Sequence, residues 1–140
     1  MPLGPIPRQR RVTRDDETLA RAIYPVLMDV VRRKGSITYA DVVLSVRERC
    51  PEPEHPIYRE KPRDLGRRLE TLRFFTAPRG YPDMTCVVFN AGPCPSPDAY
   101  EDPGSEAAKV AAFDWSAVEE ELALQCDDWR REAMSVVHLR

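Results

Sequence analysis

The sequence has no long hydrophobic run. No stretch approaches the roughly 18 consecutive apolar residues that a membrane-spanning helix needs. The opening letters, MPLGPIPRQRR, contain no apolar segment of the kind that forms a secretory signal. These absences predict a protein of the cytoplasm that has no membrane partner.

Cysteine and histidine are also scarce. The chain has four cysteines (Cys50, Cys86, Cys94 and Cys126) and two histidines. The cysteines do not form the dense framework of small secreted domains, so we expect free thiols. Cys50 and His55 have a C-x4-H spacing that two zinc ligands could use, with Cys86 and Cys94 as the other pair. No C-x2-C pair supports that interpretation, so we expect neither a metal nor another cofactor.

Catalytic motifs are missing as well. The sequence contains no Gly-rich phosphate loop, no nucleophile elbow and no His-Glu zinc helix. His138 has no identifiable acid partner. We therefore expect that the protein is not an enzyme, and we assign no catalytic residues.

Lysine is rare, and charge is unevenly distributed. Of the 21 basic residues only three are lysine, and the formal net charge is −2. Residues 1–80 contain 17 Lys+Arg and 11 Asp+Glu, a balance of +6, whereas residues 81–140 contain 4 and 12, a balance of −8. Separated charge of one sign steers oppositely charged molecules. The pattern indicates either an electrostatic partner or only a solvated surface with uneven charge.

The composition that is present is ordinary for a globular protein, with 42% hydrophobic and 31% charged residues. Residues 1–12 carry three prolines and three arginines without periodicity, which predicts a flexible basic arm. The length suits one core, so residues 13–140 are expected to form a single domain.

The first predicted helix begins at Thr13, because Asp16 three residues later is in the capping-box position. Gly35 is expected to supply the left-handed residue that ends it. Pro25 lacks an N–H group, so it should kink the helix near residues 21–24 or break it in two. The apolar stripe of this helix comprises Leu19, Ile23, Leu27, Val30 and Val31.

A second and a third helix are predicted in the middle of the chain. Ile37 to Tyr39 is a short extended segment, and Thr38 caps a helix that ends before Pro51. After a proline-rich loop, residues 62–75 are predicted to be helical. Leucines occupy one face of that helix, and the other face is expected to be basic and exposed. The leucines are Leu65, Leu69 and Leu72, and the other face and its flanks carry Arg63, Arg67, Arg68, Glu70, Arg73 and Phe74.

The last part of the chain contains the best strand signal, MTCVVFN at residues 84–90. A long loop follows over residues 91–104, and residues 105–115 are compatible with either helix or strand. Ser116 and Glu119 predict a capping box for a final helix, whose stripe is Val118, Leu122, Cys126, Trp129 and Ala133. Residues 135–140 could form a short edge strand. The fold class is therefore α+β and winged-helix-like: an N-terminal helix, a helix-turn-helix, a small β-sheet and a C-terminal helix.

Two motifs in residues 36–75 resemble a known family. The letters ITYADV at residues 37–42 and RDLGRRL at residues 63–69 look like the DNA-binding half of alkylguanine-DNA alkyltransferases and their non-catalytic relatives. In that family the motif arginine fills the gap left by a flipped nucleotide, and the tyrosine lies against a phosphate. The resemblance implies these roles for Arg63 and Tyr39.

The chain departs from that family at the reactive cysteine. The family carries Pro-Cys-His-Arg after the recognition helix, whereas Cys86 here lies in Thr-Cys-Val-Val. Alkyl transfer needs a thiolate, and Cys86 has no neighbouring base in sequence. The connection between Tyr39 and Arg63 is also longer than in the family. The chain is similar, besides, to small uncharacterised proteins of bacterial phages and other mobile elements, a similarity that implies no mechanism.

The first functional hypothesis is non-catalytic DNA binding through the helix at residues 62–75. Arginine suits this role because its planar fork makes paired hydrogen bonds to phosphate and guanine. The alternative is a solvated helix face whose charges meet Glu60, Asp64 and Glu70. The residues expected to contact DNA are Tyr39, Arg63, Arg67, Arg68 and Arg73, with Arg8, Arg10, Arg11 and Arg14 from the arm.

The second functional hypothesis is protein binding, as an adaptor or inhibitor of a mobile-element type. Acidic side chains in the second half would engage a basic partner or mimic phosphates. They could equally stabilise only the N-terminus of the final helix. The residues of this acidic surface are Glu119, Glu120, Glu121, Asp127 and Asp128.

Overall fold

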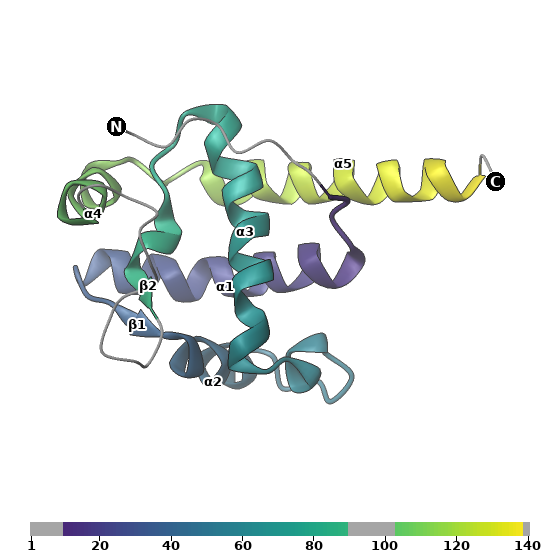
Figure 1. Ribbon diagram of the computed structural model, residues 1–140, viewed down its shortest axis with the longest axis horizontal. Helices are drawn as coiled ribbons and strands as arrows, with labels where there is room; N and C mark the ends of the chain where they lie inside the picture. Colours follow the sequence, from purple (N-terminus) through teal and green to yellow (C-terminus); the bar gives the residue numbers. More distant parts are fainter. Residues whose placement is uncertain (1–9, 90–102, 139–140) are drawn as a thin grey trace.

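The computed structural model describes residues 10–89 and 103–138, which are mostly helical with one small sheet (Figure 1). The central helix α1 contacts α2, α3, α4 and α5. Short 3-10 helices, labelled η, connect several elements. In chain order the elements are α1 (Arg14–Arg32), β1 (Ile37–Thr38), α2 (Tyr39–Arg49), η1 (Pro56–Arg59), η2 (Pro62–Asp64), α3 (Leu65–Thr76), η3 (Ala77–Arg79), η4 (Met84–Val87), β2 (Val88–Phe89), α4 (Pro103–Ala112) and α5 (Val118–His138).

The start of α1 confirms the predicted capping box. The Thr13 side chain accepts from the Asp16 N–H, and Asp16 Oδ2 accepts from the Thr13 N–H at 2.9 Å. The predicted flexible arm is wrong from Arg10 onward, because Val12 is buried in the core and Arg10 bonds to α1 and α3. Residues 1–9 lie outside the described part of the chain.

The end of α1 differs from the prediction. The left-handed residue is Lys34, with φ of 55°, and not Gly35. The Lys34 N–H donates to the Val31 carbonyl and the Gly35 N–H to the Val30 carbonyl, both at 3.0 Å, which is the Schellman pattern. The helix is also continuous through Pro25, so of the predicted kink or break the break is wrong, and the packing of α2, α3, α4 and α5 against α1 supports the continuous helix.

The sheet is a single parallel pair in which Ile37 lies opposite Val88 and Thr38 opposite Phe89. The predicted strand at residues 84–90 is only partly correct, because Asp83 caps a 3-10 helix that takes up Met84–Val87 and leaves β2 two residues long. Asn90 lies outside the described residues. Thr38 caps α2 as predicted, by accepting from the Asp41 N–H.

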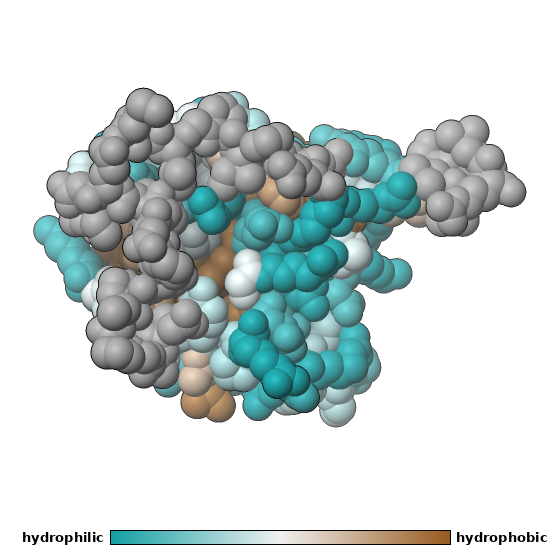
Figure 2. Space-filling view, in the orientation of Figure 1, coloured by the Kyte–Doolittle hydropathy of each residue, from teal (hydrophilic) through white to brown (hydrophobic). Residues whose placement is uncertain are grey.

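The core lies where α3 crosses α1. The three leucines predicted to dock α3, Leu65, Leu69 and Leu72, are all buried. Phe74, which was expected on the outer face, is buried as well, because the Arg10 guanidinium covers its ring at 5.1 Å from the centroid. The face shown in Figure 2 is hydrophilic over much of the described surface, with few apolar side chains reaching it.

The C-terminal elements settle an ambiguity and correct two predictions. Residues 105–112 belong to helix α4, so the strand alternative for this segment is wrong. Helix α5 begins at Val118 rather than Ser116, because the Ser116 N–H donates to Asp114 Oδ1 in a turn before the helix. The segment 135–138 is helical and not an edge strand. The buried stripe of α5 is confirmed at Val118, Leu122, Cys126 and Trp129.

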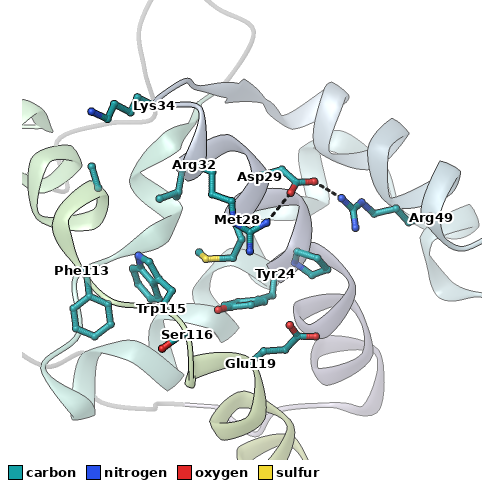
Figure 3. Close-up of a pocket in the computed structure, with 13 residues that line it drawn as sticks. Tyr24, Met28, Asp29, Arg32, Lys34, Arg49, Phe113, Trp115, Ser116 and Glu119 are labelled. Atoms are coloured by element: carbon teal, nitrogen blue, oxygen red, sulfur yellow. Dashed lines mark hydrogen bonds and ion pairs between the residues drawn. The ribbon is translucent and has the colours of Figure 1, made fainter.

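Helix α5 lies beside α1 in the opposite direction, and its last turns extend beyond the other elements (Figure 1). Arg130 of α5 forms an ion pair with the buried Glu17 of α1. On the other side of α1, Asp29 pairs with Arg32 of its own helix and Arg49 of α2 (Figure 3). None of the described helices is both long enough and apolar enough to cross a membrane.

The end of α1 provides a test of the left-handed assignment. Replacing Lys34 with Gly should raise the free energy of unfolding by about 0.5–1 kcal/mol, because glycine adopts positive φ without steric cost. Gly35→Ala is the matched control, since a Cβ there would only meet the flexible Arg33 side chain at 3.6 Å. Urea unfolding should show a smaller change for it, and a loss of stability in Lys34→Gly would contradict the assignment.

Candidate functional site

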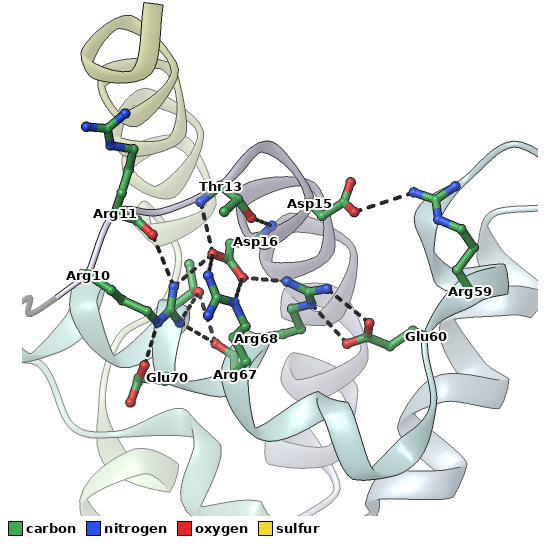
Figure 4. Close-up of polar contacts among 11 residues, drawn as sticks. Arg10, Arg11, Thr13, Asp15, Asp16, Arg59, Glu60, Arg67, Arg68 and Glu70 are labelled. Atoms are coloured by element: carbon green, nitrogen blue, oxygen red, sulfur yellow. Dashed lines mark hydrogen bonds and ion pairs between the residues drawn. The ribbon is translucent and has the colours of Figure 1, made fainter. Parts of the chain in front are cut away.

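A fully buried carboxylate, Asp16 of α1, lies at the centre of a group of arginines (Figure 4). Arg10 Nη1 donates to Asp16 Oδ2 at 2.8 Å. Arg67 Nε and Arg68 Nη1 donate to Asp16 Oδ1 at 3.1 and 2.5 Å. One carboxylate therefore joins the N-terminal segment, α1 and α3.

Two further carboxylates complete the network. Glu60, also buried, accepts from Arg68 Nε and Nη2 at 3.0 and 3.1 Å, a paired geometry. Glu70 accepts from Arg10 Nε at 2.8 Å. We name the network the Asp16 cluster, and it comprises Arg10, Asp16, Glu60, Arg67, Arg68 and Glu70. With three arginines and three carboxylates its formal charge is zero.

The charge of Asp16 is stabilised by its partners. Burial by itself would raise the pKa of Asp16, but the hydrogen bonds from the Thr13 N–H and from Arg68 outweigh it and hold the pKa below the usual value. Burial would likewise lower the pKa of Arg68, yet its bonds to Glu60 and Asp16 raise it. Both groups are charged near neutral pH, so the cluster is a set of ion pairs.

The prediction of an exposed basic face on the helix at residues 62–75 is therefore only partly correct. Arg63 is exposed and the Arg67 side chain is 47% exposed, although Arg67 also binds Asp16, whereas Arg68 is only 14% exposed. Arg73 pairs with Asp83 at 3.2 Å. The buried carboxylates cannot remain charged without these guanidinium groups, which explains why the arginines point inward.

Arg63 differs from Arg67, Arg68 and Arg73, which all form ion pairs. It is exposed, and no described residue forms an ion pair or hydrogen bond with it. Together with Arg59 and Arg67 it lines a pocket of about 550 Å³ that Asp15 and Asp64 also border. Arg59 is bound to Asp15, at 3.4 Å.

The other predicted DNA contacts are scattered. Arg11 and Arg14 are exposed near the start of α1, whereas Tyr39 is half-buried and packs against the core at the start of α2. Arg8 lies outside the described residues. These side chains and Arg63 do not form one described network.

The five predicted acidic residues all lie in the first half of α5 and differ in their partners. Glu121 accepts from the Tyr81 hydroxyl at 2.9 and 3.0 Å, and this bond raises the pKa of Tyr81. Asp128 forms an ion pair with Arg131. Glu119, Glu120 and Asp127 are exposed, and no described residue pairs with them.

Two large apolar side chains accompany these acids on the solvent side of α5. Leu124 is 65% exposed and Met134 is 57% exposed. At 100° per residue they lie about 80° apart around the helix and about 15 Å apart along its axis, on one face of α5. We name this face the outer strip of α5, and it comprises Glu120, Leu124, Asp127, Asp128, Arg131 and Met134.

The thiols do not form a reactive centre. Burial raises the pKa of Cys86 and of Cys126 to about 12, and the pKa of Cys50 is raised as well. All three are free thiols, so at neutral pH they are protonated and poor nucleophiles. Cys94 lies outside the described residues.

The described side chains also provide no metal centre. Within residues 10–89 and 103–138, no group of three or more His, Cys, Asp or Glu side chains could hold a metal ion. His55, one of the candidate zinc ligands, instead accepts a hydrogen bond from the Ile57 N–H at its Nδ1.

Sequence reasoning missed the residues that organise the site. Asp16 was recognised only as a capping residue, although its place on the buried face of an amphipathic helix was a signal of an internal ion pair. Leu124 is a single leucine on an otherwise polar face of α5, so the apolar periodicity of the sequence did not indicate that it is exposed. Glu60 was recognised only as an acid that the arginines of the helix at residues 62–75 could meet at the surface, and the sequence gave no signal that it is buried.

No protein-family model matches the chain, and neither a curated protein nor a solved structure is significantly similar to it. What the protein binds must therefore be inferred from its own side chains.

The Asp16 cluster predicts acid sensitivity. Because the folded-state pKa of Asp16 lies below its ordinary value of 3.8, the carboxylate stabilises the fold above about pH 4, and this contribution is lost as pH falls through the folded-state pKa. Asp16→Asn should lower the free energy of unfolding by about 3 kcal/mol at pH 7 and by less at pH 3.

The matched control is Asp29→Asn, which removes an exposed carboxylate bound to Arg32 and Arg49. Its expected cost is below about 1 kcal/mol. Denaturant unfolding between pH 3 and 7 makes the comparison. Equal losses for the two variants would show that burial of Asp16 has no special importance.

Proposed function

We propose that the protein is a protein-binding adaptor or inhibitor that docks the outer strip of α5 against a basic partner. The observation that carries the proposal is the exposure of Leu124 and Met134 on a strip that also bears Glu120 and Asp127. Large apolar side chains flanked by unpaired charge are typical of helices that bind in a groove.

The chemistry of the partner follows from the strip. Its two apolar side chains would fill an apolar groove, and its acids would face lysines or arginines on the groove's rim. The projection of the last turns of α5 beyond the other elements leaves room for a partner to approach (Figure 1). The three free thiols among the described residues suit a reducing compartment, so we place this interaction in the cytoplasm.

The distribution of charge supports this function over the others. Most arginines of the α3 region are bound to internal carboxylates, whereas the acids of the outer strip mostly face water. The protonated thiols also favour a binding role over a covalent one.

The proposal predicts that contact is localised to α5. A photo-crosslinking residue in place of Leu124 should capture a specific protein in cells, and the same residue in place of Leu44 should not. Leu44 is the matched control because it is exposed to a similar degree, 55%, on α2. With the captured protein purified, combined Leu124→Ser and Met134→Ser should raise Kd about tenfold or more.

Charge reversal gives a second measurement on the complex of this protein with its captured partner. Glu120→Arg with Asp127→Arg should raise Kd and abolish its increase with salt, since both effects come from attraction to a basic rim. Capture from both positions, or an unchanged Kd in both double variants with circular dichroism intact, would refute docking through α5.

A second candidate function is nucleic-acid binding, which rests on Arg63. This exposed guanidinium has no described partner and borders a pocket with Arg59 and Arg67, so these three could contact successive phosphates. In this alternative the segment from α1 to β2 is a winged helix and α3 is its recognition helix. The paired state of Arg10, Arg68 and Arg73 makes the available surface smaller than the sequence suggests.

This alternative predicts steep salt dependence. Three phosphate contacts would weaken binding of a labelled 20-base-pair duplex about 40-fold between 50 and 200 mM salt. Arg59→Gln with Arg63→Gln should remove about two-thirds of that dependence, whereas Arg33→Gln, an exposed arginine at the end of α1, should change it little. Fluorescence anisotropy measures the Kd of the unmodified chain, of the double variant and of the control at each salt concentration. Absence of binding at 50 mM salt would eliminate the alternative.

A further inference from the structure

A second pocket, of about 560 Å³, lies between the C-terminal half of α1 and the segment that joins α4 to α5 (Figure 3). Phe113 and Trp115 lie on one side of it, and Tyr24 and Met28 of α1 lie on the other. This volume is within the range of small-molecule sites in proteins, roughly 300–1,000 Å³.

The aromatic wall of the pocket is held in place by the core. The ring centroids of Phe113 and Trp115 are 4.6 Å apart, those of Tyr81 and Phe113 are 5.0 Å apart, and those of Phe75 and Tyr81 are 6.2 Å apart. Trp115 Nε1 donates to the Val110 carbonyl of α4 at 2.9 Å. The indole ring therefore has a fixed orientation, which lets it serve as a flat surface for stacking.

The Tyr24 hydroxyl is the polar group inside the pocket. Tyr24 is only 3% exposed as a whole residue, and no described residue forms a hydrogen bond with its hydroxyl, which is not itself among the buried unpaired atoms and is open to the pocket. Figure 3 shows the hydroxyl pointing toward Ser116 and Trp115. Burial, and then the charge of Glu119, raise the pKa of Tyr24 to about 12, so it is a neutral donor at physiological pH. A ligand that covers this hydroxyl would have to accept its hydrogen bond, since a hydroxyl that is buried without a partner costs free energy.

Charged groups border the pocket on the side of α1 and α2. Arg32, Lys34 and Arg49 line it, and Asp29 lies among them. Asp29 accepts from Arg32 and Arg49, so it offsets only part of their charge, while Lys34 has no described partner. Glu119 borders the pocket near Tyr24, and its charge would oppose an anion at that end. An anionic group would therefore lie near Lys34 and Arg32.

We propose that this pocket binds a small planar aromatic compound that carries one anionic group. The aromatic part stacks against Trp115 and Met28, and a polar atom on the ring system accepts a hydrogen bond from the Tyr24 hydroxyl. The anionic group lies against Lys34 and Arg32. A purely apolar ligand would leave the hydroxyl unpaired, and a highly charged one would leave the aromatic wall unused.

The test uses 1-naphthoate as the probe and 1-naphthamide, which has the same shape without charge, as its matched control. The chain has two tryptophans, so a nitrogen–proton correlation spectrum of the labelled full chain shows two indole signals, and Trp129→Phe assigns them. Naphthoate should shift the Trp115 signal with a Kd on the order of 1 mM, as expected for a ligand of this size. Naphthamide should bind several-fold more weakly.

Two variants test the polar contacts. Quinoline-4-carboxylate has a ring nitrogen that can accept from the Tyr24 hydroxyl, so Tyr24→Phe should raise its Kd about three- to tenfold and change the Kd of naphthoate, which has no ring acceptor, much less. Lys34→Gln should raise the Kd of naphthoate several-fold and leave the Kd of naphthamide unchanged. Arg33→Gln, an exposed neighbour that does not line the pocket, should leave both unchanged.

Four results would overturn the proposal. They are no shift of the Trp115 signal at about 10 mM naphthoate, equal affinity for naphthoate and naphthamide, a shift confined to Trp129, and an unchanged Kd of quinoline-4-carboxylate in Tyr24→Phe. The comparison of the two probes on the unmodified chain needs no variant, so a failure of Tyr24→Phe to fold would still leave the proposal falsifiable.

Discussion

The structure depends on the neutralisation of Asp16. This carboxylate is fully buried at the start of the central helix, and three guanidinium groups from two other segments converge on it. A buried charge is tolerated only when it is paired and hydrogen-bonded. Because the arginines come from the N-terminal segment and from α3, the same interaction that neutralises Asp16 also sets how α3 crosses α1.

This use of charge determines which surfaces remain for binding. Arg10, Arg67, Arg68 and Arg73 are bound to carboxylates, so α3 offers a smaller basic surface than its sequence suggests. On α5, Glu119, Glu120 and Asp127 are exposed and no described residue pairs with them. The acids of α5 are therefore more available to a partner than the arginines of α3.

The outer strip of α5 and the aromatic pocket are separate surfaces that meet at the first turn of α5. Glu119 borders the pocket, and Glu120 begins the strip one residue later. The strip is convex and exposed, which suits a macromolecule, whereas the pocket is concave and is lined by aromatic rings and the Tyr24 hydroxyl, which suits a small molecule. Both rest on the antiparallel packing of α5 against α1.

The sequence by itself determined the helices, their caps at Thr13 and Thr38, and the buried leucines of α3, because local hydrogen bonds and apolar periodicity decide these features. Only the tertiary structure decided where the arginines point, that Met84–Val87 forms a 3-10 helix, and that Tyr24 faces a pocket. The reason is physical: an arginine side chain is long enough to reach either water or a buried carboxylate, and that choice depends on groups about 50 residues away in sequence.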